Sequence, residues 1–211
     1  MFGTHDLTLF IVSGLLLNMV PGPDSLLIMT RSATQGWRAG SSAALGIGTG
    51  TLVHVFAAAL GLSAILATSA TAFMIVKLAG AAYLLYVGVQ LLFSKTRPAQ
   101  PGSDEKPLAR LSHRQIFLQG FMTNVLNPKV AVFFLAFVPQ FISPDASSKP
   151  LAFIALGFIF NFNGMLWCHL LAASTALASH KIKINSGLVQ WLNRLIGGVF
   201  VSFGVKLALS K

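Results

Sequence analysis

The sequence predicts an all-α integral membrane protein whose six transmembrane helices form two inverted three-helix repeats, with helices 1 and 4 broken. Of the 211 residues, 55% are hydrophobic and only 9% are charged, and the mean hydropathy is +0.74. Soluble domains carry about 25% charged residues, so the composition excludes an ordinary soluble protein. A second observation is a pair of proline-containing breaks inside apolar segments, at Pro21-Gly22-Pro23 and at Asn127-Pro128.

Six apolar stretches are long enough to cross a bilayer, which takes about 20 residues each. The first is not a cleavable signal peptide, because no Lys or Arg precedes Arg31 and the stretch exceeds a signal-peptide core. A cytoplasmic linker at about 94–115, with three prolines and charges of both signs, divides the single transmembrane domain of residues 1–211 into two repeats, about 1–93 and about 116–211. The predicted spans are 7–29, 40–64, 71–93, 116–142, 150–177 and 187–208.

The distribution of basic residues between loops predicts the orientation of the chain. The loops on the opposite side of the membrane contain only Lys149, Lys206 and Lys211. Because cytoplasmic loops carry the excess of Lys and Arg, both termini are predicted to lie outside, and the net charge of +10 does not indicate a nucleic-acid partner. The loops after the first, third and fifth spans contain nine basic residues: Arg31, Arg38, Lys95, Arg97, Lys106, Arg110, Arg114, Lys181 and Lys183.

The two halves resemble each other at two places. Asn18 precedes the first break as Asn124 precedes the second, and residues 77–86 align without gaps with residues 194–203. A unit of three spans forces the next unit to enter the membrane upside down, and such inverted repeats are typical of secondary transporters with a midplane site at broken helices. Each proline frees a backbone carbonyl, and we expect the amides of Asn18 and Asn124 to bind these carbonyls.

Asp24 and Lys129 each follow a break deep inside an apolar span, where one charge costs about 2.5–3.5 kcal/mol. We expect the pseudo-twofold relation to bring them together as an ion pair or a water-bridged pair. The pair would position a zwitterionic substrate or exchange a proton. The alternatives are a purely structural pair and a Lys129 side chain that extends to the membrane interface.

Two histidines, His54 and His169, lie within the apolar spans and are candidates for a proton relay. The alternative is a histidine hydrogen-bonded between helices. Neither has an acidic or cysteine ligand at metal spacing, so no metal site, cofactor or catalytic residue is predicted. The single Cys168 excludes an intrachain disulfide.

Three further groups of residues are expected mainly to pack helices. Asn161 and Asn163 would join helices or line a polar cavity. The aromatic stripe of Phe133, Phe134, Phe137 and Phe141 would face lipid or neighbouring helices. Glycines in the second and third spans would allow close helix approach, namely Gly46, Gly48, Gly50, Gly80 and Gly88.

Motifs along almost the whole chain resemble those of one protein family. They are Asn18 through Pro-Gly-Pro to Asp24, the turn from Gly36 to Gly40, Ala-Leu-Gly-Ile-Gly at 44–48, the block from Gly80 to Gly88, and Gly120-Phe121 through Asn127-Pro128-Lys129 to Pro139-Gln140-Phe141. Together they resemble the LysE (lysine exporter) family, with its homoserine/threonine-exporter branch as the nearest likeness. The long charged linker is the one departure, and it affects no transport residue.

The resemblance implies a multi-pass exporter of amino acids or their derivatives in the bacterial inner membrane, with periplasmic termini. It implies export driven by the proton-motive force with alternating access, and it leaves a homodimer open. The partners would be a small amino acid, protons and the lipid bilayer. By analogy the substrate or coupling site would comprise Asn18, Pro21, Gly22, Pro23 and Asp24 with Asn124, Asn127, Pro128 and Lys129.

Physically, a helix N-terminus opened by the first break can face a substrate carboxylate while Asp24 holds the ammonium. Two other functions compete with export. The same breaks would also line a passive channel for small zwitterions. A membrane-embedded hydrolase would use Asp24, His54 or His169 as acid and base, although no nucleophile stands in a recognisable motif.

Overall fold

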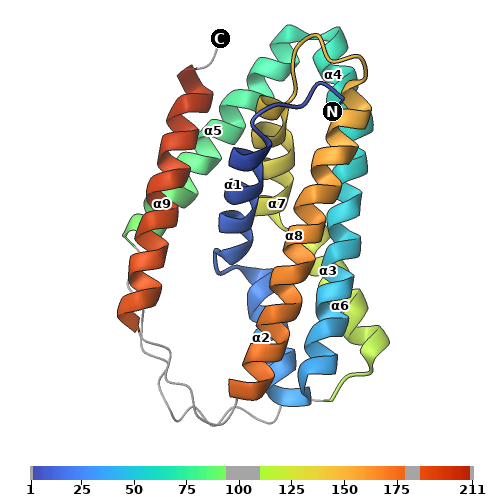
Figure 1. Ribbon diagram of the computed structural model, residues 1–211, viewed down its shortest axis with the longest axis vertical. Helices are drawn as coiled ribbons and strands as arrows, with labels where there is room; N and C mark the ends of the chain where they lie inside the picture. Colours follow the sequence, from blue (N-terminus) through green and yellow to red (C-terminus); the bar gives the residue numbers. More distant parts are fainter. Residues whose placement is uncertain (1, 94–109, 179–185, 210–211) are drawn as a thin grey trace.

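The computed structural model describes residues 2–93, 110–178 and 186–209, and these residues form helices joined by short connections (Figure 1). They contain no β-strand, only an isolated bridge between Thr4 and Ile142. Three short segments, η1 (Ala58–Leu62), η2 (Phe133–Phe137) and η3 (Val138–Phe141), extend the neighbouring helices. The helices are α1 (Leu7–Met19), α2 (Pro23–Gln35), α3 (Trp37–Ala57), α4 (Ser63–Thr68), α5 (Ala70–Leu92), α6 (His113–Val125), α7 (Pro128–Val132), α8 (Lys149–Ala178) and α9 (Ser186–Leu209).

The helical segments explain how the chain crosses a membrane. Three of them are long and apolar enough to span it alone: Trp37–Ile65, Met74–Leu92 and Lys149–Ala178. Two bent pairs bring the number of candidate spans to five if each pair is one span. The all-helical, multi-pass architecture is therefore confirmed, whereas six crossings in two inverted repeats remain a prediction.

Both bent pairs are broken at the predicted prolines. The chain bends by 56° between α1 and α2 and by 47° between α6 and the segment Pro128–Phe141. Pro23 and Pro128 occupy the first turns of α2 and α7, where a helix makes no use of the missing N–H. At the second break Asn127 caps α7, because its Oδ1 accepts the backbone N–H of Lys129 at 3.0 Å.

Glycines bring α3 and α6 into backbone contact. A Cβ atom at Gly46 would overlap the carbonyl oxygen of Phe117, and one at Gly120 would overlap that of Ala43. The predicted role of Gly46 in close helix packing is therefore confirmed. The pair α5 and α9 is joined in the same way at Gly88, and these two helices lie side by side at the edge of the bundle (Figure 1).

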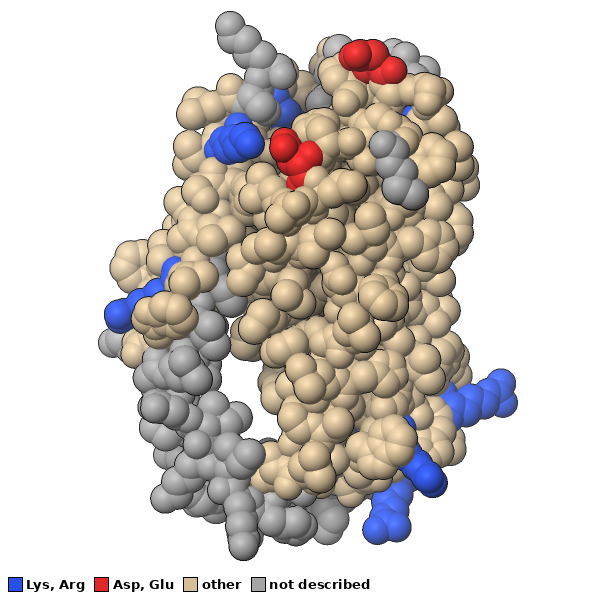
Figure 2. All heavy atoms as spheres, in the orientation of Figure 1, with Lys and Arg blue, Asp and Glu red and all other residues tan. Residues whose placement is uncertain are grey.

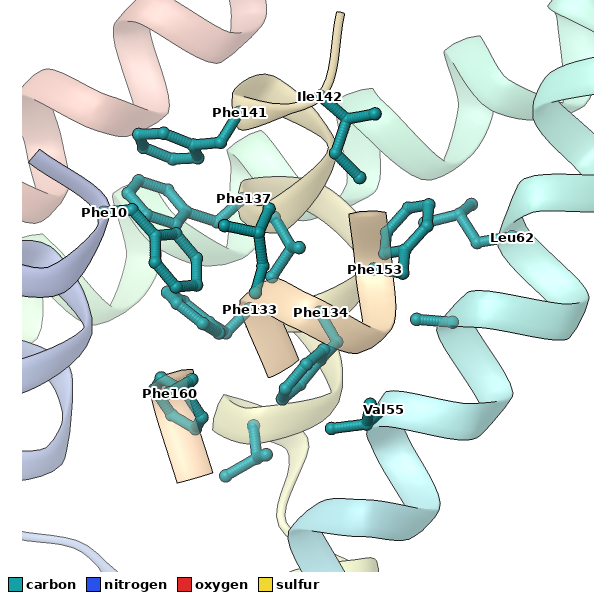
Figure 3. Close-up of a cluster of buried hydrophobic side chains, with 14 of the residues drawn as sticks. Phe10, Val55, Leu62, Phe133, Phe134, Phe137, Phe141, Ile142, Phe153 and Phe160 are labelled. Atoms are coloured by element: carbon teal, nitrogen blue, oxygen red, sulfur yellow. The ribbon is translucent and has the colours of Figure 1, made fainter. Parts of the chain in front are cut away.

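A phenylalanine-rich core fixes the second broken helix between α1 and α8 (Figure 3). The ring of Phe133 stacks on that of Phe160 with centroids 4.6 Å apart, and Phe10 meets Phe141 edge-on at 5.2 Å. The predicted aromatic stripe faces neighbouring helices, because none of its four rings is more than 4% exposed. The alternative that the stripe faces lipid is wrong. The core holds η2 and η3 against the rest of the bundle and so sets the position of the break.

The two ends of the molecule differ in what they contain. Both termini lie at one end, and the α2–α3 connection lies at the other (Figure 1). Of the nine basic residues used to predict orientation, Arg31, Arg38, Arg110 and Arg114 lie on α2, α3 and α6 or next to them, at the end opposite the termini. Most of the predicted linker, and the remaining five residues, lie outside the described residues: Lys95, Arg97, Lys106, Lys181 and Lys183.

Candidate functional site

The carboxylate of Asp24, in the first turn of α2, is bound by the second break. Its Oδ2 accepts hydrogen bonds from Nδ2 of Asn124 at 2.9 Å and from Nδ2 of Asn127 at 3.0 Å. Asp24 is only 9% exposed, and its other oxygen, Oδ1, is buried without a hydrogen-bond partner. The carboxylate is therefore anchored through one oxygen and leaves a buried acceptor at the other.

The ammonium of Lys129, in the first turn of α7, is bound by the first break. Its Nζ donates to the carbonyl oxygen of Leu17 at 3.2 Å and to that of Val20 at 3.1 Å. These carbonyls lie at the C-terminal end of α1, where the helix leaves acceptors unsatisfied and carries partial negative charge. Each charge thus binds the other break, and the two broken helices are cross-linked by polar contacts over about a hundred residues of sequence.

This crossed arrangement corrects one expectation from the sequence and one of its alternatives. Asp24 and Lys129 do not form a direct ion pair: within the described part of the chain, the ion pair within 4.0 Å joins His5 and Asp6. The other form of the expectation, a water-bridged pair, stays a prediction. Lys129 does not extend to the interface either. The reason is that each break offers its own partners, carbonyls for the cation and side-chain amides for the anion.

The second correction concerns the freed carbonyls. The amides of Asn18 and Asn124 were expected to bind them, but Lys129 does so at the first break and Asn124 donates to Asp24 instead. Asn18 has a buried Nδ2 without a hydrogen-bond partner. A charged donor is the stronger partner for a carbonyl, so the ammonium replaces the amide.

Residues of α3 support Asn124 from the other side. Thr51 donates through Oγ1 to Oδ1 of Asn124 at 3.3 Å. Nε2 of His54 lies 3.0 Å from the backbone oxygen of Asn124, and because a carbonyl only accepts, this nitrogen carries the proton. The His54 ring also stacks on Phe134, with centroids 6.3 Å apart. Asn124 therefore connects His54 to the Asp24 carboxylate, since it contacts both residues.

The second histidine is placed differently. Nδ1 of His169 donates to the carbonyl of Met165, one turn earlier on its own helix, at 2.9 Å. Neither His54 nor His169 is among the described residues that line the cavity between the breaks. The two candidates for a proton relay are thus unequal, since His54 alone contacts the polar network of Asp24.

A cavity of about 30 Å³ lies between the breaks and has room for about one water molecule. Its polar lining includes Asp24, Lys129, Asn18, Asn124 and Thr51. Asp24 and Asn18, which carry a buried unpartnered acceptor and a buried unpartnered donor, both line this small cavity. A ligand that carries both an ammonium and a carboxylate matches this pair of atoms.

The remaining predicted site residues shape the cavity without lining it. Gly22 lies beside the Lys129 ammonium, since a Cβ atom there would be 3.4 Å from Nζ. Asn127 anchors Asp24, and the prolines fix the two breaks in the backbone. The prolines concerned are Pro21, Pro23 and Pro128.

One wall of the cavity comes from α8, for which the sequence offered Asn161 and Asn163 as cavity residues and His169 as a relay. Asn161 lines the cavity, as one of its two alternatives stated, and Asn163 does not. The spacing of i, i+3, i+4 and i+7 places the α8 residues on one helical face, and this spacing is the signal that could have identified them. Apart from Asn161, these α8 residues are Gly164, Met165 and Cys168. The largely apolar part of the lining also includes Phe160, Ile47, Leu17 and Val130.

Comparison with known proteins adds an independent line of argument. Residues 15–211 match the family model of the LysE type translocators. The uncharacterized membrane protein YrhP of Bacillus subtilis is 31% identical, over 98% of this chain and 100% of its own length. Leucine efflux proteins of Klebsiella pneumoniae and Salmonella typhimurium are each 28% identical, over 98% of this chain and 96% of theirs. No solved structure matches the chain.

Proposed function

Because the chain belongs to the LysE family of translocators, and is therefore a transporter rather than an enzyme, we propose that it exports an amino acid across the bacterial inner membrane. The transport would be proton-coupled, with alternating access to the cavity between the breaks. The observation that carries the proposal is that one cavity is lined both by Asp24, which has a buried unpartnered acceptor, and by Asn18, which has a buried unpartnered donor.

The two unpartnered atoms suggest how an amino acid would bind. Oδ1 of Asp24 would accept the substrate ammonium, and Nδ2 of Asn18 would donate to its carboxylate. The side chain would then lie against the apolar wall formed by Ile47, Phe160 and Met165. An aliphatic amino acid fits this wall, and the name of the leucine efflux relatives makes leucine the first substrate to test.

Proton coupling would follow from competition at a single atom. Oδ1 of Asp24 can hold a proton or the substrate ammonium but not both, because each needs the same lone pairs. Arrival of a proton from the outside would release the substrate, and loss of that proton to the cytoplasm would restore the binding site. His54, bonded to Asn124, is the proposed relay for this proton, whereas His169 donates to Met165 on its own helix.

Alternating access would require the two breaks to separate. Pockets for small molecules usually have about 300–1,000 Å³, and the present cavity of about 30 Å³ is far smaller. The crossed contacts of Asp24 and Lys129 hold this closed arrangement together. Rocking of one half against the other would stretch them and widen the cavity.

We place this motion between two inverted repeats, with α9 as the sixth crossing and both termini in the periplasm. The similar bends of 56° and 47° and the crossed contacts at the two breaks support the repeat. The arginines at the end opposite the termini support the orientation. The orientation is tested by introducing a single cysteine at Thr8 in a Cys168→Ser background and labelling it on intact cells with an impermeant reagent.

Transport in proteoliposomes tests the proposed function. Purified protein would be reconstituted, and uptake of labelled leucine and other amino acids would be measured with an inside-acid pH gradient, with and without an uncoupler. Accumulation above the external concentration that the uncoupler abolishes is the expected result. Downhill flux that persists without a gradient would establish the passive channel instead.

Matched variants separate site effects from general effects. Asp24→Asn should abolish accumulation, whereas Asp145→Asn, which removes an exposed acid at the end of the molecule with the termini, should not. No transport of any amino acid by folded protein would overturn the proposed substrate class.

A further inference from the structure

Three glycines of α3, Gly46, Gly48 and Gly50, do not share the same neighbours. A Cβ atom at Gly46 would overlap a backbone oxygen of α6, and one at Gly50 would lie 2.9 Å from another backbone oxygen of that helix. A Cβ atom at Gly48 would instead overlap Sδ of Met165, on α8. Packing against α6 therefore accounts for Gly46 and Gly50 but not for Gly48.

Gly48 and Met165 meet at the cavity between the breaks. Both residues line it, Gly48 from α3 and Met165 from α8, and the two helices lie side by side (Figure 1). The atoms nearest to a Cβ at Gly48 all belong to side chains, namely those of Met165 and Asn161. The missing side chain at Gly48 thus makes room for a side chain of α8 rather than for its backbone.

Helix α8 presents two different faces. Phe162 and Leu166 are 65% and 58% exposed, and they form part of an apolar outer face. On the side drawn in Figure 2, neither blue nor red spheres cover the middle of α1 and α8. Such an uncharged surface suits lipid, so the face of α8 that can contact a substrate is the inner one, with Asn161, Gly164 and Met165.

The inner face of α8 is polar at one residue and apolar at the next. A Cβ atom at Gly164 would lie 3.3 Å from Nδ2 of Asn18, the donor proposed for the substrate carboxylate. Met165 follows directly and lies beside Gly48. Because the ammonium and carboxylate are common to all amino acids, only the apolar part of the lining can distinguish one substrate from another.

Of the three residues in the apolar wall, Met165 is the most adaptable. Phe160 is 3% exposed and stacks on Phe133, and Ile47 is 5% exposed, so both are fixed in the hydrophobic core. Met165 is only partly buried and is not among the core residues of the described part of the chain. An unbranched thioether side chain adjusts its shape easily, so the size of the apolar wall depends on where Met165 lies.

We propose that Met165 and Gly48 together determine the length of the substrate side chain that the protein exports. The inference rests on the proposed function, because it assigns a role to two further residues of the same cavity. Met165 closes the apolar part of the cavity, and Gly48 provides the space beside it. A larger residue at position 48 displaces Met165 into the cavity and shortens the accepted side chain, whereas a smaller residue at position 165 lengthens it.

Competition between straight-chain amino acids in proteoliposomes tests the inference. A mixture of alanine, α-aminobutyrate, norvaline, norleucine and α-aminoheptanoate, which differ by one methylene each, is offered with an inside-acid pH gradient. Mass spectrometry of the vesicle contents gives the relative kcat/KM of each compound. One methylene in a hydrophobic pocket changes such a ratio about 10- to 200-fold. Met165→Ala should raise the ratio of α-aminoheptanoate to norvaline at least about 10-fold, and Gly48→Ala should lower it by a similar factor.

The double variant Gly48→Ala/Met165→Ala tests whether the two residues act on each other. Its length preference should match that of Met165→Ala, because the added methyl group then has no Met165 side chain to displace. A merely structural effect of Gly48→Ala would persist without Met165. If the effect of Gly48→Ala is equally large in both backgrounds, the proposal is wrong.

Matched controls use the same substitutions outside the cavity. Met122→Ala, at a half-exposed position of α6, and Gly61→Ala, where a Cβ meets nothing within 4 Å, should leave the length preference unchanged. An unchanged preference in Met165→Ala or in Gly48→Ala, or an equal loss of uptake for every chain length, would overturn the inference while export by the wild type stands. Absence of uptake of any amino acid by the wild type would instead overturn the proposed function, and this inference with it. Each single variant decides the question alone if the other does not fold.

Discussion

Replacing Asp24 by Asn removes one charge from the centre of the molecule without changing its shape. The amide oxygen of Asn can still accept the hydrogen bonds that Asn124 and Asn127 now donate at 2.9 and 3.0 Å. The amide nitrogen then occupies the position of Oδ1, which is the unpartnered acceptor of the wild-type protein. The substitution therefore exchanges an acceptor for a donor at one atom of the cavity.

The effect on stability should be small because two contributions offset each other. Hydrogen bonds to charged groups contribute about 1.5–3 kcal/mol and neutral ones about 0.5–1.5 kcal/mol, so two weakened bonds cost roughly 2–3 kcal/mol. Removing a charge from the middle of a membrane helix returns about 2.5–3.5 kcal/mol. The free energy of unfolding should thus change by no more than roughly 1.5 kcal/mol.

The effect on transport should be large. An ammonium that meets a donor instead of a carboxylate loses a charge-assisted hydrogen bond of about 1.5–3 kcal/mol, which corresponds to roughly 10- to 150-fold weaker binding. Proton coupling should disappear as well, because an amide does not take up the proton that the carboxyl exchanges.

Equilibrium binding of labelled leucine and pH-driven accumulation in proteoliposomes would measure both effects on the same preparation. The melting temperature provides the control for folding, and Asp145→Asn the control for loss of an acid elsewhere. An Asp24→Asn variant with wild-type affinity and uncoupler-sensitive accumulation would refute the reasoning, since neither the ammonium nor the proton would then need Oδ1.

Three further predictions test the surroundings of the site. Gly46→Leu should prevent folding, because even a Cβ atom there overlaps the carbonyl of Phe117, whereas Gly61→Ala meets nothing within 4 Å and should leave the yield of monodisperse protein unchanged. His54→Ala removes the donor to the Asn124 carbonyl, so it should lower the free energy of unfolding by about 1–3 kcal/mol, seen as a lower melting temperature, and it should slow transport. An unchanged transport rate would exclude His54 as the relay. Phe153→Ala, in the fully buried core, should destabilise the protein by about 3–5 kcal/mol in denaturant titrations, and a loss below 1 kcal/mol would contradict the packing.

Much of the local structure could be predicted from the sequence. The six apolar stretches coincide closely with helical segments, and the breaks fall at Pro21-Gly22-Pro23 and Asn127-Pro128 as predicted. Hydropathy and the missing N–H donor of proline act on neighbouring residues, so the helical segments and their breaks can be predicted without knowledge of the fold. The close-packing role of Gly46 could also be predicted, since a residue without a side chain allows a neighbouring helix to approach closely.

The partners of the buried charges could not be predicted. The sequence indicated that Asp24 and Lys129 need compensation, and the pseudo-twofold relation predicted an ion pair or a water-bridged pair. The structure instead joins Asp24 to the amides of the second break and Lys129 to the carbonyls of the first. The helical spacing of Met165 and Cys168 places them on one face of α8, but packing decided that this face is the one turned to the cavity.

By itself, then, the sequence determined that this chain is a membrane protein, where its helices run and where two of them break, because these depend on the local cost of burying charges and unpaired backbone groups. Only the tertiary structure decided which groups meet at the breaks. These contacts join residues about a hundred positions apart, and the packing of the Phe-rich core and of the glycine contacts sets their distances.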